Sequence, residues 1–191
     1  MKLFQLAPHF LFGAFLLLAP AFMHPAAAAE QLDPENTLYM DLTYGRVVIK
    51  LRPDLAPNHV AQVKKLARQG FYDNTPFHRV IPGFMAQGGD PTGTGTGGSD
   101  LPDLKAEFSK AHFGRGTVGA ARSQDPNSAN SQFFICFDDA GFLDGQYTIW
   151  GEVVSGMEFV DKIKKGSEAD NGSVENPDRI VKMQVAADAK K

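Results

Sequence analysis

The stretch over residues 77–98, FHRVIPGFMAQGGDPTGTGTGG, most constrains what this 191-residue chain can fold into. Two short apolar runs, residues 77–81 and 84–86, are separated by Pro82 and Gly83. Proline presets φ and glycine accepts positive φ, so this dipeptide is typical of a tight turn. The pattern therefore predicts a β-hairpin.

Arg79 is an unusual residue for such a hairpin. Side chains alternate between the two faces of a strand, which predicts Phe77, Arg79 and Ile81 on one side and His78 and Val80 on the other. An arginine among apolar and aromatic residues costs free energy unless it interacts with something. Arg79 is therefore the first candidate for a functional residue.

Short runs of strand character, with turn residues at their ends, continue along the chain. Further strands are predicted at residues 37–43, 46–51, 104–108, 116–121, 131–137, 147–154 and 180–185. Helical spacing occurs only in residues 57–69 and 157–163. These elements predict an all-β fold, a closed eight-stranded antiparallel barrel with two α-helices. In a barrel of this size side chains fill the interior, so a binding site is expected on the outer face or rim.

The N-terminal residues have a different character. Lys2 is followed by an apolar run over residues 10–22, and four alanines precede Glu30. This order is typical of a secretory signal peptide, and the run is shorter than the about 20 apolar residues that span a bilayer. We predict cleavage after residue 29, a folded domain over residues 30–191, and export to a bacterial periplasm. An uncleaved N-terminal anchor is the alternative.

Charge and cysteine content narrow the classes of function. Without the signal peptide, the chain has 18 basic and 22 acidic residues, a formal charge of −4 that gives no indication of nucleic-acid binding. The single cysteine, Cys136 in the run FFICF, cannot form an internal disulfide and is expected to be a buried hydrophobe. We expect a monomer with no stable membrane association after cleavage.

Several kinds of catalytic site are disfavoured. The histidines outside the signal peptide are not at metal-ligand spacing, so no metal or other cofactor is expected. Ser123 or Ser131 could be combined with His78 and Asp90, but the nucleophile-elbow pattern of a serine hydrolase is missing. The GTGTGG run lacks the following helix and lysine of a phosphate-binding loop. Its glycines are interpreted as closely packed loop backbone.

A set of apolar and hydrogen-bonding residues remains. It consists of Phe84, Met85, Phe134, Phe142 and Leu143 with Arg79, Gln87, Gln132 and Tyr147. Taken singly, phenylalanine and methionine in a β protein are usually core residues. As a set around one cation and two amides, these residues suit an extended peptide with an apolar side chain.

Three motifs, FHRVIPGFMAQGGDPTGTGTGG, DPNSANSQFFI and GFLDGQYTIWGEV, resemble the signature regions of the cyclophilin-type peptidyl-prolyl cis-trans isomerases. The similarity runs over residues 37–185 in the same order. The resemblance implies an eight-stranded antiparallel barrel capped by two helices. It also implies isomerisation of X-Pro bonds in proline-containing peptides and unfolded protein chains.

The same resemblance implies roles for individual residues. Arg79 matches the family's catalytic arginine, and Gln87 matches its substrate-orienting amide. Phe84, Met85, Phe134 and Leu143 match the walls of the family's proline pocket. Ala121 and Arg122 match the strand whose backbone pairs with the bound peptide. The expected substrate-binding set is completed by His78, Gln132, Phe142 and Tyr147.

Two positions depart from the best-known eukaryotic members. Phe142 replaces a tryptophan and Tyr147 a histidine, and both resemble the bacterial variant, as does an extra residue within 123–125. Because the tryptophan contributes to tight cyclosporin binding in the family, the resemblance alone does not predict whether this chain is sensitive to that inhibitor. Two alternatives stay open: a holding chaperone that uses the same groove, and a docking subunit that uses the polar loop 167–178.

Overall fold

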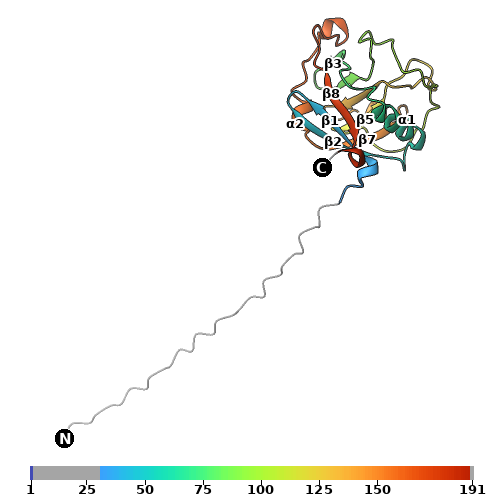
Figure 1. The fold of residues 1–191 in the computed structure, drawn as a ribbon. Helices are drawn as coiled ribbons and strands as arrows, with labels where there is room; N and C mark the ends of the chain where they lie inside the picture. Colours follow the sequence, from blue (N-terminus) through green and yellow to red (C-terminus); the bar gives the residue numbers. More distant parts are fainter. Residues whose placement is uncertain (2–30, 190–191) are drawn as a thin grey trace. The chain divides into compact units, whose positions relative to one another are not determined.

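The computed structural model describes Met1 and residues 31–189, and from Leu32 onward the chain forms one compact unit. The signal peptide predicted for residues 1–29 lies, Met1 apart, outside the described residues. Within the described part, the chain forms eight β-strands and two α-helices (Figure 1). Helix α1 (Pro57–Arg68) and the single-turn helix α2 (Met157–Val160) lie at opposite sides of the folded unit in Figure 1.

The strands follow the predicted order. They are β1 (Thr37–Leu42), β2 (Gly45–Leu51), β3 (Arg79–Ile81), β4 (Met85–Gly88), β5 (Thr117–Ala120), β6 (Phe133–Cys136), β7 (Ile149–Ser155) and β8 (Ile180–Val185). The strand predicted at residues 104–108 is wrong. Leu104 makes a single isolated bridge to Ala129, and the chain then turns so that Glu107 reaches helix α1.

The sheet is antiparallel throughout, in the order β3-β4-β6-β5-β7-β2-β1-β8. The all-β, eight-stranded prediction is confirmed, but the predicted closure into a barrel is wrong. In the described residues no ladder joins the terminal strands β3 and β8, so the sheet is a curled half-barrel with two edges.

Irregular backbone crosses the gap between the two edges. Phe77 N donates to Asp178 O at 2.9 Å, and Val80 N donates to Gly172 O at 2.7 Å. Two isolated bridges also cross the gap, Arg79 with Ser173 and Pro76 with Arg179, and Pro76 has no N–H to extend a ladder. Single hydrogen bonds from loops therefore replace the ladder that a closed barrel needs.

The inner face of the sheet carries the main core. Val47, Ile49 and Leu51 of β2 share this core with Leu38 and Met40 of β1. The alternation predicted for the first hairpin run is partly wrong, because β3 begins only at Arg79. Phe77, which precedes it, packs in the main core with Val80, and its ring meets that of Phe133 edge-on at 6.3 Å.

Helix α1 begins without a capping side chain of its own, because its N-cap residue is Ala56. Glu107 supplies the missing acceptor from the loop opposite. Its carboxylate accepts hydrogen bonds from Asn58 N at 3.1 Å and His59 N at 3.0 Å, and contacts Nδ1 of the buried His59 ring at 2.6 Å. Burial raises the pKa of Glu107, but these hydrogen bonds outweigh burial and hold the pKa below its usual value.

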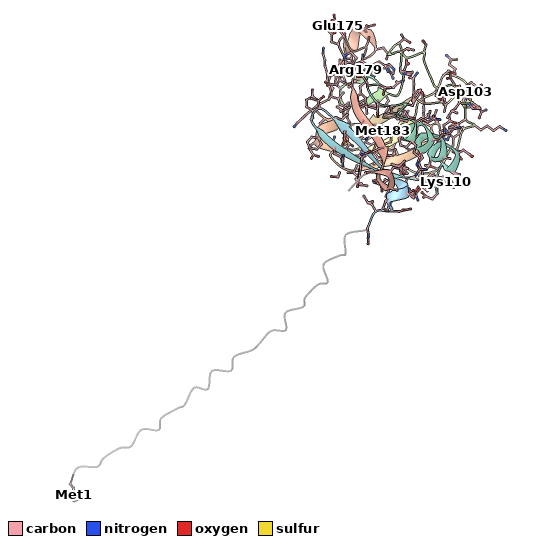
Figure 2. The ribbon with its side chains drawn as sticks, viewed as in Figure 1. Met1, Asp103, Lys110, Glu175, Arg179 and Met183 are labelled. Atoms are coloured by element: carbon pink, nitrogen blue, oxygen red, sulfur yellow. The ribbon has the colours of Figure 1, made fainter. Side chains whose placement is uncertain are left out.

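Glu107→Ala is expected to destabilise the folded unit by about 2 kcal/mol, because it uncaps α1 and leaves the buried His59 ring without a partner. Urea denaturation followed by circular dichroism measures this loss. Glu107→Gln, which keeps one acceptor oxygen, should lose less. The control is Glu175→Ala at the periphery of the unit (Figure 2), which should leave stability unchanged. Equal losses for all three variants would contradict the capping role.

Candidate active site

The outer face of the sheet carries a second apolar cluster. Side chains alternate along β4 and β6, so Met85 and Phe134 face outward while Ala86 and Phe133 face the main core. The outward cluster consists of Met85, Phe113, Phe134, Cys136, Ala140, Leu143 and Ile149. Three of its members, Met85, Phe134 and Leu143, form the floor of an open cavity of about 400 Å³, called the first pocket below.

A glycine makes room for the largest side chain of this floor. A Cβ at Gly119 would lie 2.5 Å from Phe134 Cζ and 2.8 Å from Phe113 Cε1. The rings of Phe113 and Phe134 can therefore stack, with centroids 5.8 Å apart. The predicted burial of Cys136 is confirmed, and burial raises the pKa of its thiol to about 12, so the thiol stays protonated and poorly nucleophilic.

Aromatic side chains also form the rim of the first pocket. Phe142 is 64% exposed, and its ring lies 5.2 Å from that of Phe84. Tyr147 meets Phe134 edge-on at 5.8 Å, and the Arg122 guanidinium covers the Tyr147 ring at 4.4 Å. A ligand that enters would meet aromatic surface on the floor and at the edge.

Arg79 lies at the polar side of the first pocket, where β3 and β4 pair. Arg79 is opposite Gln87 in the ladder, and its Nη1 donates to Gln87 Oε1 at 3.1 Å. Gln87 Nε2 donates in turn to Gln132 Oε1 at 2.9 Å, and Gln132 Nε2 donates to the backbone oxygens of Gly95 and Gly97. This chain of hydrogen bonds fixes the orientation of the Gln87 and Gln132 side-chain amides.

The charge of Arg79 has no acidic partner in the described part of the chain. Its other hydrogen bonds go to one neutral residue: Nε donates to Asn171 O and Nη2 to Asn171 Oδ1, both at 3.0 Å. Burial lowers the pKa of the guanidinium, although an arginine stays charged in a protein. Two of its five N–H groups are left for a ligand.

A buried carboxylate holds the glycine-rich loop beside this chain. Asp90 is fully buried and accepts from Thr92 N, Thr92 Oγ1, Gly95 N and Gly97 N at 2.7–3.1 Å. A Cβ at Gly97 would lie 2.1 Å from Asp90 Oδ1, so only glycine fits there. Burial raises the pKa of Asp90, but the four hydrogen bonds outweigh burial and lower it. The prediction of closely packed loop backbone is confirmed.

The structure brings together nearly all of the predicted site residues. The first pocket is lined by Arg79, Phe84, Met85, Gln87, Ala121, Arg122, Phe134, Phe142, Leu143, Gln146 and Tyr147. A second pocket of about 590 Å³ adjoins it and shares Gln87, Ala121 and Arg122. Gln132 lines the second pocket only. Gln146 is absent from the predicted set, although it is the neighbour of Tyr147 in the sequence.

His78 lines neither pocket. It is 9% exposed, both ring nitrogens lack hydrogen-bond partners, and burial lowers its pKa although the charge of Asp90 acts to raise it. The serine arrangement considered from the sequence is not assembled. Ser131 donates to Gly89 O at 2.8 Å, and Ser123 bonds to Ser128. In the described residues, no group of three ligands could hold a metal ion, and no helix is long and apolar enough to cross a membrane.

His112 is a residue that the sequence patterns did not single out for a role. Its Nδ1 contacts Asp144 Oδ2 at 2.8 Å, and its Nε2 contacts Asp139 Oδ2 at 2.7 Å. The hydrogen bonds and charges of Asp144 and Asp139 raise the pKa of His112. Because Phe142 and Leu143 lie between these two aspartates, His112 holds the loop that forms one side of the first pocket.

The chain is similar in sequence to several known proteins. The family model described as cyclophilin type peptidyl-prolyl cis-trans isomerase/CLD matches residues 37–185. A "Probable peptidyl-prolyl cis-trans isomerase" of Brucella suis biovar 1 is 60% identical over 189 residues, which cover 93% of this chain and 95% of that protein. The "Peptidyl-prolyl cis-trans isomerase-like 1" of Gibberella zeae is 41% identical over 140 residues, with 70% and 86% coverage.

Solved structures share the fold. Cyclophilin AquaCyp293 from Hirschia baltica superposes with a TM-score of 0.74 and 31% identity, over 83% of this chain and 77% of that one. A Cryptosporidium parvum cyclophilin type peptidyl-prolyl cis-trans isomerase, solved in the presence of the dipeptide Ala-Pro, superposes with a TM-score of 0.71 and 29% identity. That match covers 78% of this chain and 98% of the other.

His112→Asn is expected to lower the melting temperature more at about pH 5.5 than at about pH 9. Because the pKa of His112 is higher in the folded than in the unfolded protein, protonation of His112 stabilises the fold, fully so below the unfolded pKa of 6.5. This stabilisation is lost as the pH rises through the folded pKa. Differential scanning fluorimetry across this range measures the difference. Arg52→Ala, which breaks an ion pair that contains no histidine, is the control and should show no such trend. A pH-independent effect of His112→Asn would contradict a positively charged His112 in the folded protein.

Proposed function

The chain belongs to the cyclophilin-type peptidyl-prolyl cis-trans isomerase family, and we propose that Arg79 and the first pocket carry out its isomerisation of X-Pro bonds. The observation that carries this assignment is the Arg79 guanidinium. It is a partly buried cation whose acceptors among residues 31–189 are all neutral, with two N–H donors left beside an apolar floor. The cyclophilin solved with Ala-Pro supports a proline-containing peptide as the ligand.

The reaction needs rotation and no change of covalent bonds. Amide resonance sets a barrier of about 18–20 kcal/mol, so an X-Pro bond isomerises in tens to hundreds of seconds. Turnover in milliseconds requires an acceleration of about 10⁵-fold, or about 7 kcal/mol. Positioning and electrostatic stabilisation are each large enough to supply a substantial part of this.

The first pocket supplies the positioning. The apolar floor of Met85, Phe134 and Leu143 receives the proline ring, while Phe84 and Phe142 close over its edge. Ala121 and Arg122 line both pockets, so a peptide paired with their backbone would extend from one pocket to the other. With the ring and the chain beyond it held, rotation is left to the acyl side of the bond.

Arg79 supplies the electrostatic part. In the twisted amide the prolyl nitrogen regains its lone pair and can accept a hydrogen bond from the guanidinium. The planar ground state offers little such acceptor, so this bond favours the transition state over the substrate. The apolar surroundings strengthen a charge-assisted bond. Gln87, whose amide is oriented by Arg79 and Gln132, holds the peptide backbone nearby.

Arg79→Ala is expected to lower kcat/KM on an Ala-Pro peptide by about 10²–10³-fold and to leave the fold intact. Gln87→Ala should lose less. A protease-coupled or NMR exchange assay measures activity, and near-ultraviolet circular dichroism checks the fold. Arg46→Ala, an exposed arginine that lines neither pocket, is the matched control. Full activity in Arg79→Ala would remove the assignment.

We also propose that the isomerase is exported to the periplasm and acts there, as a monomer, on unfolded or newly exported chains. The leader pattern over residues 1–29 supports export. The Brucella suis protein is similar over 93% of this chain, more than residues 31–191 account for, so the likeness extends into the leader.

Cell fractionation of a bacterium that expresses the full chain tests this proposal. We expect the protein in the periplasmic fraction with Glu30 as its first residue, as N-terminal sequencing would read it. A chain that lacks residues 2–29 should stay in the cytoplasm. Recovery of the full-length protein in the membrane fraction would favour an uncleaved anchor instead.

A further inference from the structure

The loop over residues 167–178 packs against the free edge of β3, where Arg79 begins the strand. Val80 N donates to Gly172 O at 2.7 Å, and Val174 N donates to His78 O at 3.1 Å. An isolated antiparallel bridge also joins Arg79 to Ser173. The loop therefore contacts the edge of β3 beside the arginine through isolated backbone hydrogen bonds.

Asn171 links this loop to the Arg79 guanidinium by hydrogen bonds. Its φ of 49° is in the left-handed region, which asparagine tolerates better than other non-glycine residues. In this conformation the backbone oxygen and the side-chain oxygen of one residue accept from Arg79 Nε and Nη2, both at 3.0 Å. Two acceptors on a single residue restrain both the position and the plane of the guanidinium.

The next residue keeps Asn171 in place. A Cβ at Gly172 would lie 2.5 Å from Ile81 Cγ1 and 3.2 Å from the backbone of Val80, so the close approach to β3 requires glycine. The loop is also closed on itself, because Gly172 N donates to Ser167 O at 2.7 Å. Asn171 is thus set on a fixed backbone although its side chain is exposed.

The chemistry of the acceptor matters as much as its position. A carboxylate is the usual partner for a guanidinium fork, but it would neutralise the charge that the twisted amide needs. An amide oxygen and a peptide oxygen accept the same two hydrogen bonds without adding a negative charge. Together with Gln87 on the other side, Asn171 occupies three N–H groups and leaves two for substrate.

We propose that Asn171 is a positioning residue for the isomerisation, acting through Arg79 and leaving its charge uncompensated. This inference rests on the function proposed for Arg79. It assigns a role in the reaction to a loop that the motifs in the sequence do not include.

Asn171→Gly tests the side chain alone, because glycine keeps the left-handed backbone and its carbonyl. We expect kcat/KM to fall on the order of tenfold, mainly in kcat, with KM changed less than about twofold. Asn176→Gly is the matched control, since Asn176 lies in the same loop with a φ of 50°. It should retain activity within about twofold of the wild type.

Asn171→Asp separates geometry from charge. Aspartate keeps both acceptor positions but forms an ion pair with Arg79, so the fold should be as stable as the wild type while kcat falls by about tenfold or more. Added salt should partly restore the rate, because it screens an exposed pair. Unchanged kcat in Asn171→Asp would overturn the requirement for an uncompensated charge.

A double-mutant cycle with Arg79→Lys tests whether Asn171 acts through the arginine. Lysine keeps the charge but cannot form the fork, so Asn171→Gly should cost less than about twofold in that background. An equal loss in both backgrounds, or wild-type activity in Asn171→Gly, would overturn the inference. Either result leaves the role of Arg79 standing if Arg79→Ala is inactive. Full activity in Arg79→Ala would instead remove the proposed function itself.

Discussion

The alternation of side chains along β6 is the constraint on which the rest of the structure depends. Phe133 faces the main core, where its ring meets those of Tyr72, Phe77 and Trp150, while the next residue, Phe134, faces outward. One strand thus packs against the interior and contributes Phe134 to the floor of the first pocket. Because the same strands carry both apolar clusters, the stability of the core and the rigidity of the pocket floor depend on the same backbone.

Against that apolar floor, the polar side of the site is held by a continuous chain of hydrogen bonds. It runs from Asn171 through Arg79, Gln87 and Gln132 to the glycine-rich loop that Asp90 organises. Two loops far apart in the sequence are thereby linked, one bonded to Arg79 directly and the other through Gln132 and Gln87. Arg79, Gln87 and Gln132 are each hydrogen-bonded on both sides, so the cation is already oriented for the role proposed above and little reorganisation would be needed.

Much of this could be predicted from the sequence, because alternation and turn chemistry are local signals. The strands, helix α1 and the pocket set around Phe84 and Phe134 follow from such patterns and from the motifs. Closure could not be predicted, since it depends on whether the short β3 pairs with a partner about a hundred residues away. Asn171 was missed for the same reason. Its only local signal is an asparagine before a glycine, which indicates a turn and gives no sign of what the turn contacts.

The open sheet has a consequence for an isomerase that acts on X-Pro bonds in peptides. Free strand edges invite extended peptides to add as extra strands, which leads to aggregation. Here the loop with Gly172 covers the edge of β3, and at β8 Asp73 Oδ1 accepts from Met183 N at 2.9 Å. The chain itself thus covers parts of both edges. A peptide can then bind in the pockets, while few backbone groups at the edges are left to pair with it as an extra strand.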